Sequence, residues 1–296
     1  MQETVRSLED TATELSREAF AFVEKHKDKP FFLYYPTTNI HIPLTPHKRF
    51  KGSTKAGVYG LFVVEFDWAV GQLLDALDRD GLKEKTLVVL TSDNGARPHP
   101  SLNGHRCNGP WRGTKRQIHE GGHRVPLIAR WPIQVKAGIT SNETVCLTDF
   151  SRTFAKLLGQ EVPQNAGEDS YDITNILHGK PHRRPLREAT VHHSAVAGQF
   201  ALRQGDWKLI EGAGDGECPR DAKGSLAVVS RIPTRNPDSG EWLELDYFGM
   251  THDGEFQLYN LKEDPAETKN VSKDYPDKVR ELKTLLNRYR SSRRSN

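Results

Sequence analysis

Apolar residues recur at helical spacing in two early segments of the chain. The first spans residues 9–26 and the second residues 62–77, and in each the apolar side chains gather on one face. Gly81 follows the second segment and provides a natural stop, because glycine readily takes the left-handed conformation at a helix end. Both segments are therefore predicted to be amphipathic helices.

Short, continuous apolar runs alternate with these helices and predict buried strands at residues 31–35, 86–91 and 125–131. A further helix is predicted at residues 148–159, which glycine again follows. This alternation predicts an α/β domain with a largely parallel sheet. Ligands of such sheets bind beyond the carboxyl ends of the strands.

The pattern changes near residue 187, where short strands and turns replace the longer elements. Gly205-Asp206 predicts a hairpin between two of these strands. The remaining elements are one more strand at residues 256–261 and a helix at residues 274–289, with a Gly/Asp/Pro-rich insertion at residues 212–254. We predict two domains: residues 1–186 form the α/β domain, and residues 187–296 form a small α+β domain with an antiparallel sheet and one helix.

Composition narrows the classes of function. The 296 residues carry a net charge of only +3, which permits an anionic substrate but gives no reason to expect nucleic acid as a partner. There is no run of 18 apolar residues, so no membrane span is predicted. The three cysteines are widely spaced and give neither a zinc pattern nor an even disulfide framework. The oligomeric state is not predicted.

Candidate chemistry gathers in a long loop, residues 92–123, that is rich in Gly, Pro, Asn and His. Asp93 and Asn94 follow directly after a predicted strand, and their oxygens suit Ca²⁺ or Mg²⁺. Asp-Asn-Gly is also a common turn. Lys115 follows Arg112-Gly-Thr and could be a fixed charge for an anion, although an isolated lysine is more often solvated.

Two further features take an ordinary or a chemical interpretation. Glu120-Gly-Gly precedes a predicted strand and is most simply a turn. His41 lies in a proline-rich loop, where it is either a solvated side chain or a proton donor.

Taken together, these segments favour the chemical interpretation, because the chain resembles the formylglycine-dependent sulfatases of the alkaline-phosphatase-like superfamily. It is most similar to arylsulfatase A-like and N-acetylgalactosamine-6-sulfatase-like members. The segments that carry the resemblance are Pro30-Phe-Phe-Leu-Tyr-Tyr with His41-Ile-Pro, Val88-Val-Leu-Thr-Ser-Asp-Asn-Gly, Arg112-Gly-Thr-Lys115 with Glu120-Gly-Gly-His-Arg-Val-Pro, Leu202-Arg-Gln-Gly-Asp-Trp-Lys-Leu-Ile, and Leu258-Tyr-Asn-Leu-Lys-Glu-Asp-Pro-Ala-Glu-Thr.

The resemblance implies roles for individual residues. Asp93 and Asn94 would be calcium ligands, and Lys115 would contact the sulfate and stabilise charge on the leaving-group side. His41 would hold the sulfate or protonate the leaving oxygen. Four further residues of the long loop could select the substrate: His105, Asn108, Arg112 and His119. The implied substrates are sulfated carbohydrates or aryl sulfates, and the family's compartments are periplasmic, secreted or lysosomal.

The nucleophile of that family is a formylglycine made from the cysteine of a Cys-x-Pro/Ala-x-Arg motif. Cys107, Cys146 and Cys218 do not stand in such a motif. We therefore expect this chain to correspond to the C-terminal part of a sulfatase, to be poorly soluble, and to turn over no sulfate ester alone. Two alternatives remain: a non-catalytic relative that binds sulfated glycans, and a phosphoester hydrolase of the same superfamily.

Overall fold

The computed structural model describes residues 7–96, 104–180, 184–194, 200–212, 230–235, 242–247 and 256–295. The chain forms two compact units. Unit 1 comprises Met1–Leu90, Pro98–Cys107 and Leu127–Ile139, and unit 2 comprises Thr91–Arg97, Asn108–Pro126 and Thr140–Asn296. The domain boundary predicted at residues 186 and 187 stays a prediction; it falls within unit 2.

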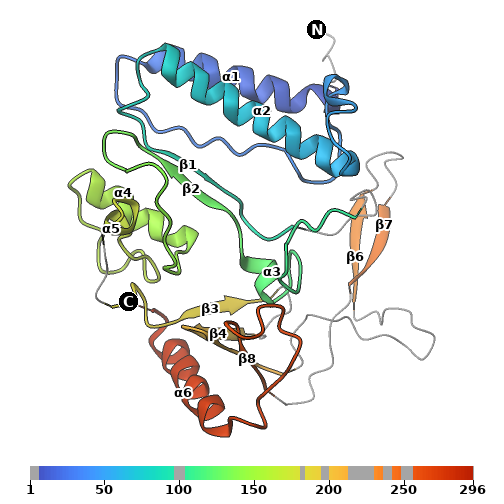
Figure 1. Cartoon of the computed structure of the whole chain (residues 1–296), viewed down its shortest axis with the longest axis vertical. Coiled ribbons are helices and arrows are strands. Elements are labelled where there is room, and N and C mark those ends of the chain that lie inside the picture. The colour runs from blue at the N-terminus through green and yellow to red at the C-terminus, as the bar shows by residue number, and fades with distance from the viewer. Residues whose placement is uncertain are drawn as a thin grey trace. The chain divides into compact units, whose positions relative to one another are not determined.

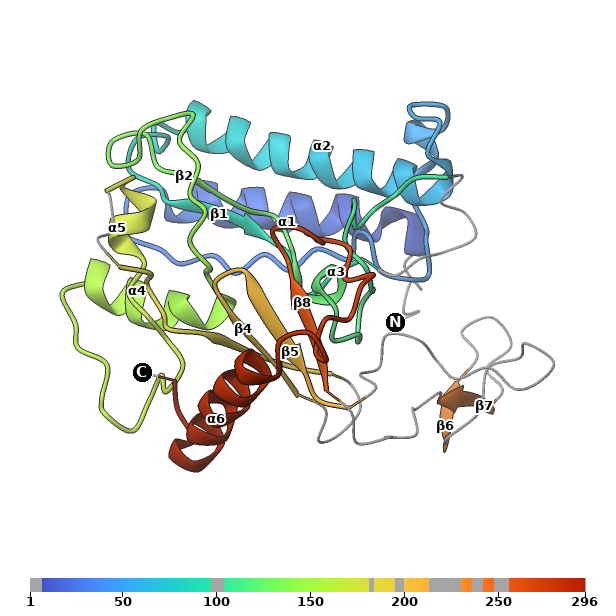
Figure 2. The same ribbon diagram turned by 60° about the horizontal axis from the view of Figure 1, so that its bottom comes forward.

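Unit 1 is built on two helices that lie side by side in both views (Figures 1 and 2). α1 (Thr11–His26) follows a short 3-10 helix (Leu8–Asp10), and α2 (Gly57–Arg79) follows another (Lys48–Phe50). Small side chains of α1 are buried at helical spacing, which lets the helices approach closely: Ala12, Ser16, Ala19 and Val23. Both predicted helices are present.

α2 is long and apolar enough, by length and composition alone, to cross a membrane. Core helices of soluble proteins pass the same test. In this fold Leu77 is buried in a cluster with Val23 of α1 and Leu82, and Phe62 and Ala69 are buried farther back along the helix. α2 therefore packs against α1 through one face, and 28% of its apolar window is buried.

The strand predicted at residues 31–35 is wrong. This segment is not a strand, and its side chains alternate between half-buried and exposed, with Phe32 71% and Tyr34 77% exposed. Phe31 and Leu33 pack against the cluster of Val23 and Leu77. A continuous apolar run predicts burial on both faces, whereas in the described fold only alternate side chains of this segment are partly buried.

Two short strands complete unit 1. β1 (Val88–Thr91) pairs with β2 (Leu127–Arg130) in a two-stranded sheet, so the two strands predicted at residues 86–91 and 125–131 form and pair with each other. The α/β class is confirmed. The largely parallel sheet stays a prediction. The strand pairs of unit 2 whose register is established are antiparallel.

Unit 2 contains a four-stranded antiparallel sheet in the order β3 (Thr190–His193), β4 (Phe200–Gln204), β5 (Trp207–Ile210) and β8 (Gln257–Asn260). Gln204 pairs with Trp207, so the β4–β5 hairpin has a two-residue turn. Gly205 takes the first central position with a φ of +57°, as a type II′ turn requires. The predicted hairpin is confirmed.

Both faces of this sheet are covered, because successive side chains of a strand point to opposite faces. On one face, Leu202, Leu209 and Leu258 pack against Leu282 and Leu286 of α6 (Pro276–Ser292) (Figure 2). On the other face, Ala201, Ile210 and Tyr259 pack against Ile118 and Leu261. The sheet therefore lies between the C-terminal helix and the loop that carries Ile118.

The remaining elements of unit 2 are short. They are α3 (Glu120–His123), a 3-10 helix (Leu147–Asp149) leading into α4 (Phe150–Leu157), α5 (Thr174–Leu177), and the antiparallel pair β6 (Ser230–Arg235) and β7 (Trp242–Tyr247). The helix predicted at residues 148–159 corresponds to α4. Apart from β6 and β7, most of the insertion at residues 212–254 lies outside the described residues.

Candidate functional site

Asp93 and Asn94 lie in the turn that directly follows β1. The Asp93 side chain is exposed and the Asn94 side chain is half-buried. Ser92 Oγ donates to the Asn94 carbonyl oxygen at 3.1 Å and lies 3.4 Å from Asp93 Oδ1. The turn therefore presents a carboxylate and an amide oxygen from adjacent positions, and both are hard donors.

Glycines bring this turn against α3. The Gly95 amide donates to the Gly122 carbonyl oxygen at 3.0 Å, and a side chain at Gly95 would place its Cβ 1.8 Å from the Gly121 carbonyl oxygen. Side chains at Gly121 and Gly122 would likewise collide with backbone, at 2.4 Å from the Gly113 oxygen and 2.1 Å from the Gln117 oxygen. Glu120-Gly-Gly is thus a close-packing element rather than a simple turn.

Lys115 is attached to the same structure. Its amide donates to the Ala96 carbonyl oxygen at 3.3 Å, and its side chain is half-buried. Asn108 links the two segments, because its Oδ1 accepts from the Ala96 amide at 2.9 Å and its Nδ2 donates to the Ala96 and Gly113 carbonyl oxygens at 2.9 and 3.0 Å. The Asp93 turn and the Lys115 turn are therefore held as one unit.

A buried charge network supports this loop from the sheet side. Lys208 of β5 has no exposed surface, and its Nζ lies 2.8 Å from the Ile118 carbonyl oxygen, 3.1 Å from Glu120 Oε1 and 3.0 Å from Glu267 Oε1. Glu267 Oε2 also accepts from the Glu120 amide at 2.7 Å. The ammonium thus joins β5 to the beginning of α3 and to the loop after β8.

Two arginines complete the network around Glu120. Its Oε2 accepts from Arg124 Nε at 2.7 Å and from Arg203 Nη1 at 3.0 Å. Burial alone would raise the pKa of Glu120, but Lys208 and its other positive neighbours hold that pKa well below its usual range. Burial raises the pKa of Glu267, and Lys208 is its one countercharge among the described residues. The sequence pattern did not predict this network, because nothing in it distinguishes Lys208 from a solvent-exposed polar residue of a short strand.

Three histidines lie against this network. Burial lowers the pKa of His119 to about 2 and that of His123 to about 4, with positive neighbours adding to both shifts. His119 has no exposed surface, and neither ring nitrogen has a hydrogen-bond partner among the described residues. His123 and His192 have ring centroids 4.5 Å apart. These imidazoles are therefore neutral at physiological pH and act as packing groups there.

His41 and His105 belong to unit 1. His41 is exposed, and its Nδ1 lies 2.7 Å from the Ile42 carbonyl oxygen, which leaves Nε2 as the nitrogen that faces outward. Its loop is anchored by buried Glu65, which accepts from Asn39 Nδ2 at 3.3 Å. His105 is exposed, 6.1 Å from the Tyr59 ring between centroids. Glu65 was predicted only as part of an amphipathic helix.

Arg112 serves the loop that carries Lys115. Its Nη1 donates to the Glu267 carbonyl oxygen at 2.8 Å, and its own carbonyl oxygen accepts from the Gly121 amide at 2.6 Å. In unit 2 the structure therefore gathers Asp93, Asn94, Asn108, Arg112, Lys115 and His119, which the sequence had placed on one loop.

The donors of Asp93 and Asn94 fit calcium in kind but not in number. Calcium takes six to eight oxygen ligands, and the described residues contain no group of three or more His, Cys, Asp or Glu side chains placed to hold a metal ion. Formylglycine does not fit the described cysteines either, since Cys107 and Cys146 lie outside its sequence motif.

Comparison with known proteins gives a consistent result. Residues 5–160 match the family model described as Sulfatase, and residues 111–217 match that of the C-terminal region of N-sulphoglucosamine sulphohydrolase. N-acetylgalactosamine-6-O-sulfatase of Bacteroides thetaiotaomicron is 34% identical over 286 residues, covering 94% of this chain and 50% of the relative. Human arylsulfatase A is 30% identical, covering 88% of this chain and 49% of the relative.

A solved structure from work on glycosaminoglycan metabolism by Bacteroides thetaiotaomicron superposes with a TM-score of 0.79 at 32% identity. The match covers 98% of this chain and 56% of that one. The chain therefore spans about half the length of the relatives that it matches.

Proposed function

Because this chain belongs to the sulfatase family, we propose that its loop at residues 92–123 binds the sulfate group of a sulfated carbohydrate or an aryl sulfate. Support comes from two sides. The relatives include an N-acetylgalactosamine-6-O-sulfatase and an arylsulfatase. In the described part of the loop, an ammonium group and hard oxygen donors lie on two turns that hydrogen bonds to Ala96 hold together.

The observation that carries this proposal is the attachment of the Lys115 turn to the Asp93 turn. Lys115 bonds to Ala96, and Asn108 clamps the same residue. These bonds fix the backbone that carries Lys115, and an ammonium anchored in this way would stabilise the negative charge that builds up on the oxygens of a sulfate ester as its bond breaks. We assign Lys115 to the sulfate and its leaving-group side.

The other residues take proposed roles that follow their positions. Asp93 and Asn94 would supply two of the six to eight oxygen ligands of a calcium ion, and the others would come from water, the substrate or residues outside those described. The ion would supply positive charge for an anionic substrate. His41 Nδ1 is engaged by the Ile42 carbonyl oxygen, so Nε2 of the imidazolium form would hold the sulfate or give a proton to the leaving oxygen. His41 belongs to unit 1, so its role is assigned separately from that of the unit 2 loop.

Substrate selection is assigned to His105, Asn108, Arg112 and His119. The exposed His105 is free to meet a ligand. Asn108 and His119 would act indirectly, because the Asn108 amide hydrogens already go to backbone carbonyls and His119 is fully buried. These two residues would set the shape of the loop that the substrate meets.

We expect binding without turnover from this chain alone. Hydrolysis in the family passes through a covalent step on formylglycine, and the cysteine motif for that group does not occur in these 296 residues. The Lys115 loop favours sulfate over a phosphate monoester, which is the substrate of the alternative phosphoester hydrolase. The other alternative, a non-catalytic relative that binds sulfated glycans, would use the same binding loop. It would differ from a sulfatase only in never hydrolysing the sulfate ester.

The test is calorimetric titration of the chain with N-acetylgalactosamine 6-sulfate, with and without calcium. Lys115→Met should abolish saturable binding, whereas Lys136→Met, which removes an exposed lysine of unit 1, should leave it unchanged. A parallel assay with an aryl sulfate should show no product. Binding that survives Lys115→Met would refute the assignment, and robust turnover would refute the expectation that the chain is inactive alone.

A further inference from the structure

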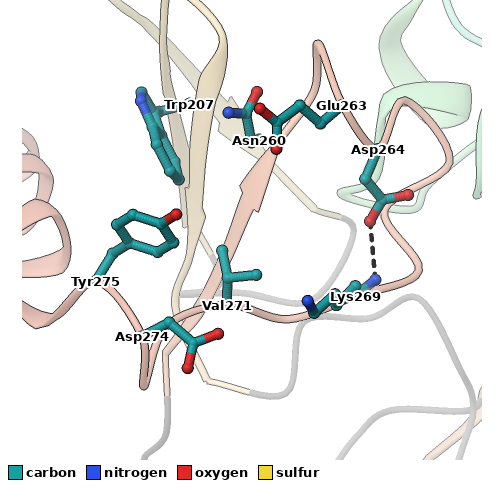
Figure 3. A pocket seen from close by; sticks show the side chains of 8 residues that line it. All are labelled: Trp207, Asn260, Glu263, Asp264, Lys269, Val271, Asp274 and Tyr275. Carbon is teal, nitrogen blue, oxygen red and sulfur yellow. Dashed lines mark hydrogen bonds between the residues drawn. The ribbon is translucent and has the colours of Figure 1, made fainter.

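A second, separate recess lies on unit 2, between the end of the β4–β5 hairpin and the loop that leads from β8 to α6 (Figure 3). It has a volume of about 370 Å³, at the lower end of the range for small-molecule sites. None of the residues assigned to sulfate or calcium lines it. The recess therefore requires its own explanation.

Its lining is divided into an apolar wall and a polar rim. Trp207 and Tyr275 lie on one side, with ring centroids 5.1 Å apart and planes inclined by 58° (Figure 3). Tyr275 is 48% exposed although it is a large aromatic side chain. The polar groups of Asn260, Glu263 and Asp274 stand around this wall. The wall thus offers an apolar face with hydrogen-bond acceptors at its edge.

The recess is preformed by the loop that closes it. Asp264 accepts from the Thr268 amide at 2.7 Å, from the Thr268 hydroxyl at 3.0 Å and from the Lys269 amide at 2.8 Å (Figure 3). The Val271 amide donates to the Leu258 carbonyl oxygen at 2.9 Å and so ties the loop to β8. A ligand would therefore meet a fixed shape and lose little affinity to loop ordering.

Two carboxylates remain available to a ligand. Among the described residues, no hydrogen bond or ion pair engages the side chains of Glu263 or Asp274, whereas that of Asp264 is used by the loop. The lining carries three carboxylates against the single ammonium of Lys269. This excess of negative charge disfavours a sulfate group.

From these features we infer that the recess binds an uncharged sugar ring. The C–H face of a pyranose fits the aromatic wall of Trp207 and Tyr275, and its hydroxyls can donate to Glu263, Asp274 and Asn260. The charge of the lining would also attract an organic cation, but the two rings contact each other instead of forming the aromatic cage that such a cation needs, so a sugar ring fits the wall better.

This inference goes beyond the sulfate-binding loop and does not depend on it. A sulfated glycan has sugar residues without sulfate beside those that carry it, so this recess would hold an unsulfated part of the same kind of polymer. The two sites differ in charge, so the Lys115 loop would bind an anionic sulfate group, whereas the carboxylates of the recess would repel it. Failure of one site leaves the other untouched.

The test uses the whole chain labelled with ¹⁵N and follows the indole signal of Trp207, which the variant Trp207→Phe identifies. N-acetyllactosamine should shift this signal saturably in the millimolar range, and its sulfated form should bind at least about tenfold more weakly. Tyr275→Ala and Asp274→Asn should each weaken binding by about fivefold or more. Thermal melting of each variant shows that it is folded.

Matched controls lie on the surface outside the recess. Tyr34→Ala removes an exposed tyrosine of unit 1 and Asp277→Asn removes a neighbouring carboxylate of α6, and both should bind as the unmodified chain does. The inference is overturned if no saturable shift occurs up to about 50 mM sugar. It is also overturned if the sulfated sugar binds as well as the neutral one, or if choline binds instead with the same sensitivity to Tyr275→Ala.

Discussion

Replacing Lys208 by Met should test whether the buried charge network holds the proposed sulfate-binding loop in place. The two side chains have similar length and volume, so the change removes the ammonium and little else. Three contacts disappear, to Ile118, Glu120 and Glu267. Glu120 keeps Arg124 and Arg203, but Glu267 loses the one countercharge that the described part of the chain gives it.

The expected cost follows from that imbalance. Removing one partner of a buried ion pair costs about 3–5 kcal/mol, because the charge left behind is not solvated. Because two arginines remain paired with Glu120, we expect Lys208→Met to lower the free energy of unfolding by about 3 kcal/mol, the lower end of this range. Lys83→Met is the control: its ammonium lies 3.2 Å from Asp78 but is 49% exposed, so its loss should cost less than about 1 kcal/mol.

The pH dependence gives a second, independent measure. Burial already raises the pKa of Glu267, and loss of Lys208 should raise it further. The folded variant then binds a proton more readily than the unfolded chain, so acidification relieves the buried charge. The destabilisation measured by urea unfolding should therefore be smaller at about pH 5 than at about pH 8.

A double variant distinguishes loss of charge pairing from a packing defect. Lys208→Met with Glu267→Gln removes both charges of the pair and should be more stable than Lys208→Met alone, with a coupling energy of about 1–3 kcal/mol. Hydrogen exchange at the amides of residues 112–123 should rise in the single variant and recover in the double one. A cost below about 1 kcal/mol that is the same at both pH values would refute the reasoning.

Three further predictions concern the same unit. Gly95→Ala should destabilise the chain and loosen the 92–123 loop, because its Cβ would lie 1.8 Å from the Gly121 oxygen, whereas Gly71→Ala in α2 should be neutral or stabilising in the same thermal melts. Arg187→Met should cost about 3 kcal/mol in urea unfolding, because it leaves a buried carboxylate without its countercharge. The pKa of His119 is about 2 in the folded chain and 6.5 in the unfolded chain, so below pH 6.5 the unfolded chain binds a proton more readily. The free energy of unfolding should therefore fall by up to about 1.4 kcal/mol per pH unit below pH 6.5. His119→Leu should reduce that slope when unfolding is measured as a function of pH.

Much of the architecture could be predicted from local patterns. The helices of unit 1, the β4–β5 hairpin and α6 follow from periodicity and from glycines that end elements or form turns. These features depend only on residues that are close together in the sequence, so local patterns are enough to predict them. The loop at residues 92–123 was likewise found, because its residue types suit one kind of chemistry.

The pattern was insufficient where burial depended on distant partners. Residues 31–35 read as a buried strand, yet the described fold covers only alternate side chains, and Phe32 and Tyr34 stay exposed. An apolar run indicates that its side chains gain free energy by burial, but it does not indicate which other segment will cover them. The helix register of α2 likewise gave no sign that Glu65 would be fully buried and would anchor the His41 loop.

The sequence by itself determined most of the helices and strands, within a few residues of their ends, and which loop carries the candidate chemistry. Only the tertiary structure decided how that loop is held. Lys208 meets Glu120 across 88 positions of sequence, and Glu120 meets Glu267 across 147. Local periodicity contains no information about such contacts, because they form only when folding takes these polar groups out of water and brings distant partners to them.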